Sequence, residues 1–241
     1  MDYAPTDDDY RFNVDIWAPF LADLDVCSRY SIYPLSNQEI VAIQNGMMPL
    51  LRRLQAWVIQ CINANPEGMF FRLGTRSPKD VWKQCATHLE DNIDAQIALC
   101  RITSMADILR LCKYSERMID DMRYHLEKYQ GTQSLCIVLA PWRPRRGIEW
   151  RCFYRQDGTF AACSYWCDDA TTATIPTSLV SFVKKVAGRL SALYDRMVVD
   201  VEVDGDNLWL IELNPWSEGT DPILWTWHEL DALPSGTVAW R

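Results

Sequence analysis

The sequence predicts an α+β fold in which most helices come first along the chain and most strands follow. Two observations lead to this fold class. Apolar residues recur at helical spacing up to about residue 129, and two hairpin signals, Asp157-Gly158 and the stretch 204–207, occur in the remainder. We therefore expect a helical region with a first lobe over 1–132 and a strand-rich second lobe over 133–241.

The expected helices are marked by caps and by apolar periodicity. Ser36 and Glu39 form a capping box ahead of a helix over about 37–63, with Gly46 as a potential interruption. Pro78 opens a second helix that runs to about residue 90. Two further helices cover 105–112 and 116–129, and each is preceded by a serine or threonine.

The expected strands are short apolar or alternating stretches bounded by turn residues. One covers 69–73, ahead of the helix that Pro78 opens. After residue 132 we expect one helix over 178–194. The strands of this second part are expected over 134–140, 148–155, 159–166, 197–203 and 208–213.

The composition is that of an ordinary globular protein. Of the 241 residues, 49% are hydrophobic and 23% are charged, and the formal net charge is −8. This negative balance argues against a broad nucleic-acid surface and against an anionic-membrane binder, because both favour basic residues. The compact basic segment 142–146 is then either a solvated loop or a local contact.

Several features indicate a cytoplasmic protein without a membrane partner. The nine cysteines are an odd number and include no CxxC pair, which favours reduced and mostly buried thiols. The first nine residues are acidic, unlike a signal peptide. No apolar stretch approaches the roughly 18 residues of a membrane span.

The last hairpin carries the most informative polar pattern. Alternation places Asp200 and Glu202 on one face of its first strand, and Glu212 and Asn214 on one face of its second, with Trp209 on the opposite face. A three-residue turn would set Asp200 directly across from Glu212, whereas a two-residue turn would break that pairing. Opposed carboxylates repel and are costly to desolvate, so we interpret them as oxygen ligands for Mg²⁺. The alternative is that this face is exposed to solvent.

The stretch 69–80 is a second candidate, for anion binding. A strand, a glycine-containing turn with Arg76 and a helix start capped by Ser77 direct unpaired N–H groups toward the turn. Arg72 on the strand and Lys79 in the first helical turn would add positive charge for a phosphate. Alternatively, Ser77 only caps its helix and the cations are solvated.

Arg151 is a third candidate, because it alternates with Trp150 and Cys152 and so projects from one face of a strand. Its planar guanidinium is suited to clamping a γ-phosphate. A surface ion pair is the alternative. The sequence has no Walker lysine motif, no GxGxxG and no GxSxG, so it does not indicate a classical P-loop site, a Rossmann site or a serine-hydrolase site.

Five stretches, taken in order, resemble the cell-division-cycle-123 family, a divergent branch of the ATP-grasp fold. They are Ile16-Trp17-Ala18-Pro19-Phe20, Ser31-Ile32-Tyr33-Pro34-Leu35, the stretch from Phe71-Arg72-Leu73 to Ser77-Pro78-Lys79-Asp80, Glu149-Trp150-Arg151-Cys152-Phe153, and the stretch from Trp209-Leu210-Ile211-Glu212 through Thr220-Asp221 to Trp225-Thr226-Trp227-His228. The likeness spans most of the chain. It implies an ATP-grasp fold, in which the nucleotide lies between two α+β lobes.

The resemblance also implies an ATP and Mg²⁺ site. Arg72 stands where the family has a lysine that contacts ATP phosphates, and Arg151 matches a phosphate-facing arginine, so these two are the candidate catalytic residues. Asp200, Glu212 and Asn214 match the Mg²⁺ ligands, with Glu212 in place of an aspartate.

On the adenine side, the resemblance places Val138 and Leu139 on the hinge strand, whose backbone would meet the base, close to the hinge tryptophan Trp142. Two departures remove charged pairs. Ala140-Pro141 stands where the family has a basic pair, and the stretch around Cys163-Ser164-Tyr165-Trp166 replaces another. The long acidic insert and the C-terminal tail of eukaryotic members are missing as well.

Two functions stay open at this point, because a fold does not fix a function. The leading hypothesis is an ATP-dependent ligase, in which Arg72, Arg151 and the metal neutralise the triphosphate while an acceptor attacks an activated acyl or nucleotidyl group. The acceptor would be a protein, a peptide or an RNA end. The alternative follows from the resemblance: eukaryotic members assist assembly of translation initiation factor two by binding its gamma subunit, which implies an ATP-binding assembly chaperone.

Overall fold

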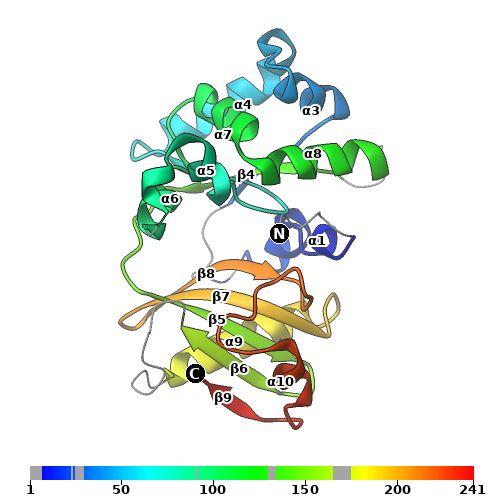
Figure 1. Ribbon diagram of the computed structural model, residues 1–241, viewed down its shortest axis with the longest axis vertical. Helices are drawn as coiled ribbons and strands as arrows, with labels where there is room; N and C mark the ends of the chain where they lie inside the picture. Colours follow the sequence, from blue (N-terminus) through cyan, green and yellow to red (C-terminus); the bar gives the residue numbers. More distant parts are fainter. Residues whose placement is uncertain (1–6, 23, 25–29, 91, 130–133, 165–174) are drawn as a thin grey trace. The chain divides into compact units, whose positions relative to one another are not determined.

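The computed structural model describes the chain outside residues 1–6, 23, 25–29, 91, 130–133 and 165–174, and its contacts divide the chain into two compact units (Figure 1). Unit 1 comprises Met1–Asp15 and Arg29–Arg145, and unit 2 comprises Ile16–Ser28 and Arg146–Arg241. The expected division between 132 and 133 needs correction, because strand β4 (Cys136–Pro141) pairs with two strands of unit 1.

Unit 1 contains a four-stranded antiparallel sheet in the order β1-β4-β2-β3. Besides β4, its strands are β1 (Ser31–Pro34), β2 (Met69–Leu73) and β3 (Arg101–Ile102). The sequence predicts β2 and β4. It does not predict β1 and β3, because strands of four and two residues are too short to show a period.

Helices cover one face of this sheet. Side chains from α3, α4, α7 and α8 pack on Phe71 and Leu139, which lie side by side in β2 and β4. The helical segments described in this unit are α1 (Asp7–Arg11), α3 (Asn37–Gln44), η2 (Met48–Leu51), α4 (Arg52–Asn63), η3 (Lys79–Val81), α5 (Trp82–Cys85), η4 (Thr87–Leu89), α6 (Ile93–Ala98), α7 (Met105–Tyr114) and α8 (Glu116–Lys128).

Two of the expected helices are broken. The helix expected over 37–63 becomes α3, η2 and α4, because Gly46 takes a left-handed conformation (φ 65°) and Pro49 follows in the first turn of η2. The helix expected over 78–90 is instead the three short segments η3, α5 and η4. Helices α7 and α8 begin where expected, and the side chains of Ser104 and Ser115 cap them.

Unit 2 contains a five-stranded sheet in the order β8-β7-β5-β6-β9, in which β9 joins β6 in parallel and all other neighbours are antiparallel. The expected strands of this part are found, and residues 165 and 166 of the stretch 159–166 lie outside the described residues. The strands are β5 (Ile148–Arg155), β6 (Phe160–Ser164), β7 (Arg196–Asp204), β8 (Asn207–Asn214) and β9 (Val238–Trp240).

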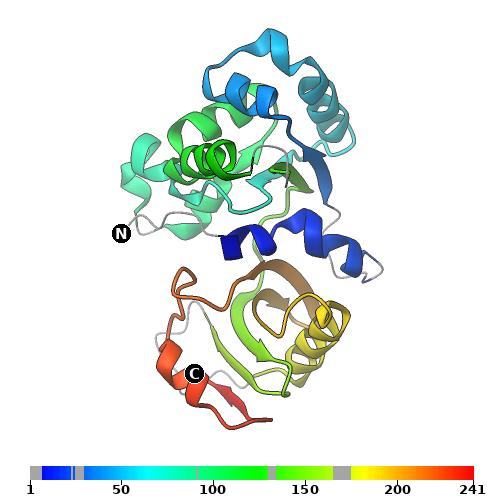
Figure 2. The ribbon, with the colours of Figure 1, turned by 90° about the vertical axis from the view of Figure 1, so that its right-hand side faces the viewer.

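Helices lie on opposite faces of this second sheet (Figure 2). Helix α9 (Thr177–Leu190) packs on β5 and β7, and alternation assigns it to the face that carries Cys152 and Val199. Helix α10 (Trp227–Ala232) contributes Leu230 to a cluster with Phe153 on the other face, which also carries Arg151. The short segments α2 (Val14–Trp17) and η1 (Ala18–Leu21) precede β1 in the chain, and η1 packs on α9.

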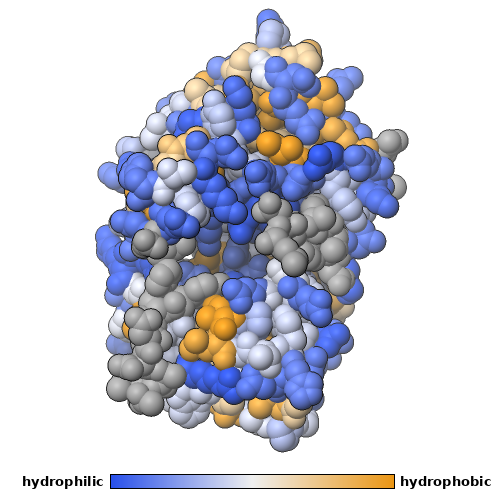
Figure 3. All heavy atoms as spheres, viewed as in Figure 1, coloured by the Kyte–Doolittle hydropathy of each residue, from blue (hydrophilic) through white to orange (hydrophobic). Residues whose placement is uncertain are grey.

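The apolar character of the described residues bears on two features, a membrane span and an exposed contact surface. None of their helices combines the length and the apolar character that a membrane span needs. The exposed apolar side chains Val41, Leu50 and Ile59 lie on α3, η2 and α4, a region where Figure 3 shows orange atoms among hydrophilic ones. Single exposed apolar residues of this kind are normal on a folded surface.

Candidate functional site

The hairpin of β7 and β8 brings Asp200 directly across from Glu212, as expected, but by a different route. Asp204 pairs with Asn207, so the turn has two residues, and such a turn alone would break the pairing of the carboxylates. A β-bulge restores it: the register shifts by one residue after Asp200, and Ile211 is the extra residue on β8.

The bulge also changes which side chains share the carboxylate face. Trp209 pairs with Glu202 and therefore lies on the face of Asp200 and Glu202, although simple alternation had placed it on the opposite face with Leu213. This expectation is corrected because the extra residue in β8 reverses the alternation between Trp209 and Glu212.

Arg151 lies in the same row of the sheet as the two carboxylates. Its β-sheet partner in β7 is Asp200, and Asp200 is in turn the partner of Glu212 in β8. Arg151 donates from Nε to Asp200 Oδ1 over 2.8 Å and from Nη2 to Oδ2 over 2.7 Å, while Nη1 donates to the carbonyl oxygen of Asp221 over 2.7 Å. The pair is buried, with the Asp200 side chain fully inaccessible and the Arg151 side chain 8% exposed. The burial of this pair excludes the alternative of a surface ion pair, and Arg151 is a buried partner of Asp200.

The three expected metal ligands lie close together on this face. Asn214 Nδ2 donates to Asp200 Oδ2 over 3.0 Å, and Glu212 is half-buried beside them on β8. Carboxylate and amide oxygens are the donors that Mg²⁺ prefers, so the donor set fits that ion. Over the described parts of the chain, no group of three or more His, Cys, Asp or Glu side chains could hold a metal. A metal here would depend on Asn214 and on oxygens from a ligand or water.

Glu202 has a separate role on the same face. Its Oε1 accepts hydrogen bonds from the backbone N–H groups of Arg146 and Gly147, both over 2.8 Å. These are the first residues of unit 2 after the chain leaves unit 1. A Cβ at Gly147 would lie 2.1 Å from the carbonyl oxygen of Val203, so only glycine allows the chain to approach β7 this closely.

In unit 1, Arg72 lies on the face of the sheet opposite to the helices, next to Val138 of β4. It is 5% exposed. Its guanidinium donates from Nε to the carbonyl oxygen of Leu73 over 3.0 Å and from Nη2 to that of Thr75 over 3.1 Å. The turn that follows β2 therefore holds the side chain in a fixed orientation.

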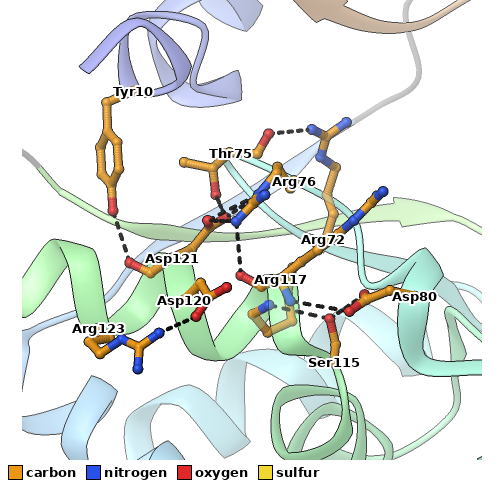
Figure 4. A network of polar contacts seen from close by, with 11 residues as sticks. Tyr10, Arg72, Thr75, Arg76, Asp80, Ser115, Arg117, Asp120, Asp121 and Arg123 are labelled. Atoms are coloured by element: carbon orange, nitrogen blue, oxygen red, sulfur yellow. Dashed lines mark hydrogen bonds and ion pairs between the residues drawn. The ribbon is translucent and has the colours of Figure 1, made fainter. Parts of the chain in front are cut away.

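Arg76, in the same turn, is held by a carboxylate on α8 (Figure 4). Asp121 on α8 is fully buried and accepts from Arg76 Nε over 3.0 Å and from Arg76 Nη2, and it also accepts from the hydroxyl of Thr75. The positive charge of Arg76 is thus neutralised inside unit 1. Arg76 ties the turn to α8.

The anion site expected at a helix start is not formed as predicted. Ser77 is buried, but it does not cap a helix: the residue at the cap position of η3 is Pro78, without a side-chain hydrogen bond. Since η3 has only three residues, it lacks the N-terminal dipole that the prediction required. Lys79 is half-buried at the start of η3.

Val138 and Leu139 occupy the middle of the sheet in unit 1. Each pairs with β1 on one side and with β2 on the other, so neighbouring strands flank β4 at both positions. Both side chains are fully buried. Trp142 follows the end of β4. Its backbone N–H donates to the carbonyl oxygen of Gly68, and the Arg101 guanidinium lies 5.7 Å from the centroid of its ring.

The structure therefore brings the expected residues together in two sets. Unit 2 groups Arg151 with the metal-ligand candidates Asp200, Glu212 and Asn214, and unit 1 groups Arg72 with its turn. Sequence reasoning missed Asp121. The signal was present, because Met118, Asp121, Met122 and His125 share the buried face of α8 at helical spacing.

Comparison with known proteins identifies relatives across most of the chain. A model of the D123 family matches residues 37–238. Two curated relatives are both named translation initiation factor eIF2 assembly protein: that of Schizosaccharomyces pombe is 25% identical over 150 residues, and that of Danio rerio is 29% identical over 140 residues. These alignments cover 56% and 53% of this chain, but 46% and 40% of the relatives. The chain thus spans about half the length of the curated relatives that it matches.

Solved structures agree on the fold. Cdc123 from Schizosaccharomyces pombe superposes with a TM-score of 0.73 over 99% of this chain and 98% of that structure, at 17% sequence identity. Its C-terminally truncated form gives a TM-score of 0.75 with the same coverage and identity. This likeness confirms the predicted α+β fold of the ATP-grasp type. Because the family model matches most of its length, the chain belongs to the D123 family.

Proposed function

We propose that this protein is an assembly factor for translation initiation factor eIF2 that binds the gamma subunit of that complex and carries ATP and Mg²⁺ in its functional form. The observation that carries the proposal is family membership across residues 37–238, together with the name that both curated relatives bear. Assembly of this kind would take place in the cytoplasm. The names of the relatives favour this function over the ATP-dependent ligase that the sequence alone put first.

The side chains in unit 2 support the ATP and Mg²⁺ part of the proposal. In it, Asp200, Glu212 and Asn214 would hold the metal, and Arg151 would contact phosphate from its place beside Asp200. Bound Mg²⁺ would supply positive charge to the triphosphate. Asp200 and Glu212 lie opposite each other with Arg151 as the adjacent cation, so one more cation would relieve the repulsion between them.

In unit 1, the proposed nucleotide contacts belong to Arg72 and Lys79. Arg72 replaces the family's lysine, and its orientation is fixed by the turn after β2. Lys79 would add a second positive charge. The adenine would lie near the end of β4 and Trp142, beyond Val138 and Leu139, since both of these residues already have strands on either side.

A binding experiment tests the assembly function directly. The purified chain is mixed with the recombinant gamma subunit of eIF2, with and without ATP and Mg²⁺, and the mixture is separated by size-exclusion chromatography. We expect a stoichiometric complex and no conversion of ATP. Conversion of ATP to AMP or ADP that requires an added protein or RNA acceptor, without any complex, would contradict the proposal and favour a ligase.

Calorimetric titration of ATP tests the site. We expect Mg²⁺-dependent binding that Glu212→Gln weakens by about tenfold or more, since this variant removes one ligand charge and leaves the Arg151–Asp200 pair intact. Asp204→Asn, at the far end of the same hairpin, is the matched control and should bind as the wild type does. Wild-type binding that is independent of Mg²⁺ would remove the metal from the proposal.

A further inference from the structure

The orientation of Arg72 is set by the turn that follows its own strand. Two of its hydrogen bonds run to the carbonyl oxygens of Leu73 and Thr75, and the turn is closed by a hydrogen bond from the Leu73 N–H to the carbonyl oxygen of Arg76 over 3.0 Å. A guanidinium is planar and donates along fixed directions, so these two acceptors determine where its remaining N–H groups point. Whatever fixes the turn therefore contributes to the orientation of Arg72.

A carboxylate on α8 binds two side chains of the turn. Asp121 accepts from the hydroxyl of Thr75 and from the guanidinium of Arg76, which are consecutive residues of the turn (Figure 4). The Asp121 side chain is fully buried and that of Arg76 is 17% exposed. Charge-assisted hydrogen bonds of this kind are the strong ones, and burial limits their exchange with water.

The helix that carries Asp121 is itself anchored on two sides. At its start, Ser115 caps α8 and donates to Asp80 Oδ1 over 2.6 Å, while Asp80 Oδ2 accepts from the Arg117 N–H over 3.2 Å. Near its middle, the hydroxyl of Tyr10 donates to the backbone carbonyl oxygen of Asp121 over 3.1 Å. The carboxylate is thus held in place independently of the turn that it binds.

We propose that Asp121 is a positioning residue for ATP binding: it holds the Thr75–Arg76 turn, and the carbonyl oxygens of Leu73 and Thr75 orient Arg72 for contact with phosphate. The inference rests on the proposed function, in which Arg72 contacts phosphate. A side chain that is oriented before the ligand arrives loses less conformational freedom on binding, and this difference appears as affinity. Arg76, whose charge Asp121 neutralises, has a positioning role and does not contact the phosphate.

The test uses the full chain and compares two neighbouring aspartates of α8. Asp121→Asn keeps the shape of the side chain but removes its charge, and Asp120→Asn is the matched control, because the ion pair that the described structure shows for Asp120 is with Arg123 on the same helix. ATP and adenosine are titrated in the presence of Mg²⁺. We expect Asp121→Asn to weaken ATP binding by about tenfold and to leave adenosine binding unchanged, because adenosine lacks the phosphates that Arg72 contacts. Asp120→Asn should match the wild type for both ligands.

A double-mutant cycle separates positioning from a merely structural role. If Asp121 acts through Arg72, Arg72→Ala combined with Asp121→Asn should bind ATP no more weakly than Arg72→Ala alone. Thr75→Val removes one hydroxyl from the network and should weaken ATP binding less than Asp121→Asn does. Its effect should also disappear when it is combined with Arg72→Ala. This variant therefore tests the positioning role if Asp121→Asn does not fold. Independent, additive losses, or equal losses for ATP and adenosine, would overturn the inference while leaving ATP binding in place. Absence of ATP binding in the folded wild type would overturn the ATP part of the proposed function, and this inference with it.

Discussion

Each unit contains a fully inaccessible aspartate that is paired with an arginine. Asp121 accepts hydrogen bonds from the guanidinium of Arg76, and Asp200 accepts them from that of Arg151. Removing the arginine from such a pair would leave an uncompensated buried charge, which typically costs about 3–5 kcal/mol. Pairs on the surface, such as Arg123 with Asp120, contribute about 0–1 kcal/mol. The two buried pairs are therefore where single substitutions affect the fold and the candidate site together.

His125 gives a prediction for the pH dependence of stability. The side chain is buried on α8 against the ring of Tyr10, and within the described structure its Nδ1 has no hydrogen-bond partner. Burial lowers the pKa of His125 below its usual value, because the charged imidazolium is poorly solvated there. The unfolded chain, with a histidine pKa of about 6.5, then binds the proton more readily than the folded chain. We expect the free energy of unfolding to fall as the pH drops from 7 through 6.5 toward the lowered pKa, by at most about 1.4 kcal/mol per pH unit from this group.

Urea unfolding at pH 7.0 and 5.5 measures this effect. His125→Phe keeps an aromatic ring beside Tyr10 but cannot be protonated, so its stability should fall less between the two pH values than that of the wild type. An identical decrease in both proteins would show that other groups cause the acid sensitivity.

At the scale of elements, we expect alanine substitutions at two glycines of unit 2 to change the stability in opposite directions. Gly188 is exposed inside α9, and a Cβ there would meet no atom within 4 Å, so Gly188→Ala should raise the free energy of unfolding by about 0.5–1 kcal/mol. A Cβ at Gly147 would lie 2.1 Å from the backbone oxygen of Val203, so Gly147→Ala should lower it by about 1–3 kcal/mol. Urea unfolding followed by circular dichroism measures both. A loss of stability in Gly188→Ala would mean that α9 needs flexibility at that point.

Elements were predictable from the sequence where local chemistry decides them. The caps at Ser36, Ser104 and Ser115 are found in place, because a cap depends on residues three apart. The hairpin register was not predictable. It depends on the bulge at Ile211, which leaves no local signal in the sequence. The sequence predicts the Asp200–Glu212 pairing only with a three-residue turn, whereas the structure has a two-residue turn and the bulge. The burial of Asp121 was within reach of helical periodicity, but its partners in the turn at 75–76 lie 45 or more residues earlier in the chain.

At the scale of the whole molecule, charge is distributed unevenly between the units. Unit 1 contains 16 acidic and 16 basic residues, whereas unit 2 contains 16 acidic and 8 basic ones. The negative balance of the chain therefore belongs to unit 2. Repulsion by this charge disfavours non-specific binding of polyanions there. This distribution follows from the unit boundaries and could not be seen from the total charge.

The boundaries themselves give the last prediction, because each unit is assembled from separate stretches of the chain. The segment 16–28 belongs with unit 2 although more than 100 residues of unit 1 follow it, an association that composition and periodicity along the chain cannot reveal. Leu21 is fully buried in η1, and η1 packs on α9. Leu21→Ala should lower the free energy of unfolding by about 2–5 kcal/mol, because it leaves a cavity in the core. The loss of stability should be confined to unit 2, so hydrogen exchange measured by mass spectrometry should become faster in α9 and stay unchanged in α7.

The matched control is Leu54→Ala, because Leu54 is fully buried in α4 of unit 1. In this variant hydrogen exchange should become faster in α7 and stay unchanged in α9. Faster exchange in α7 with Leu21→Ala would instead place the segment with unit 1.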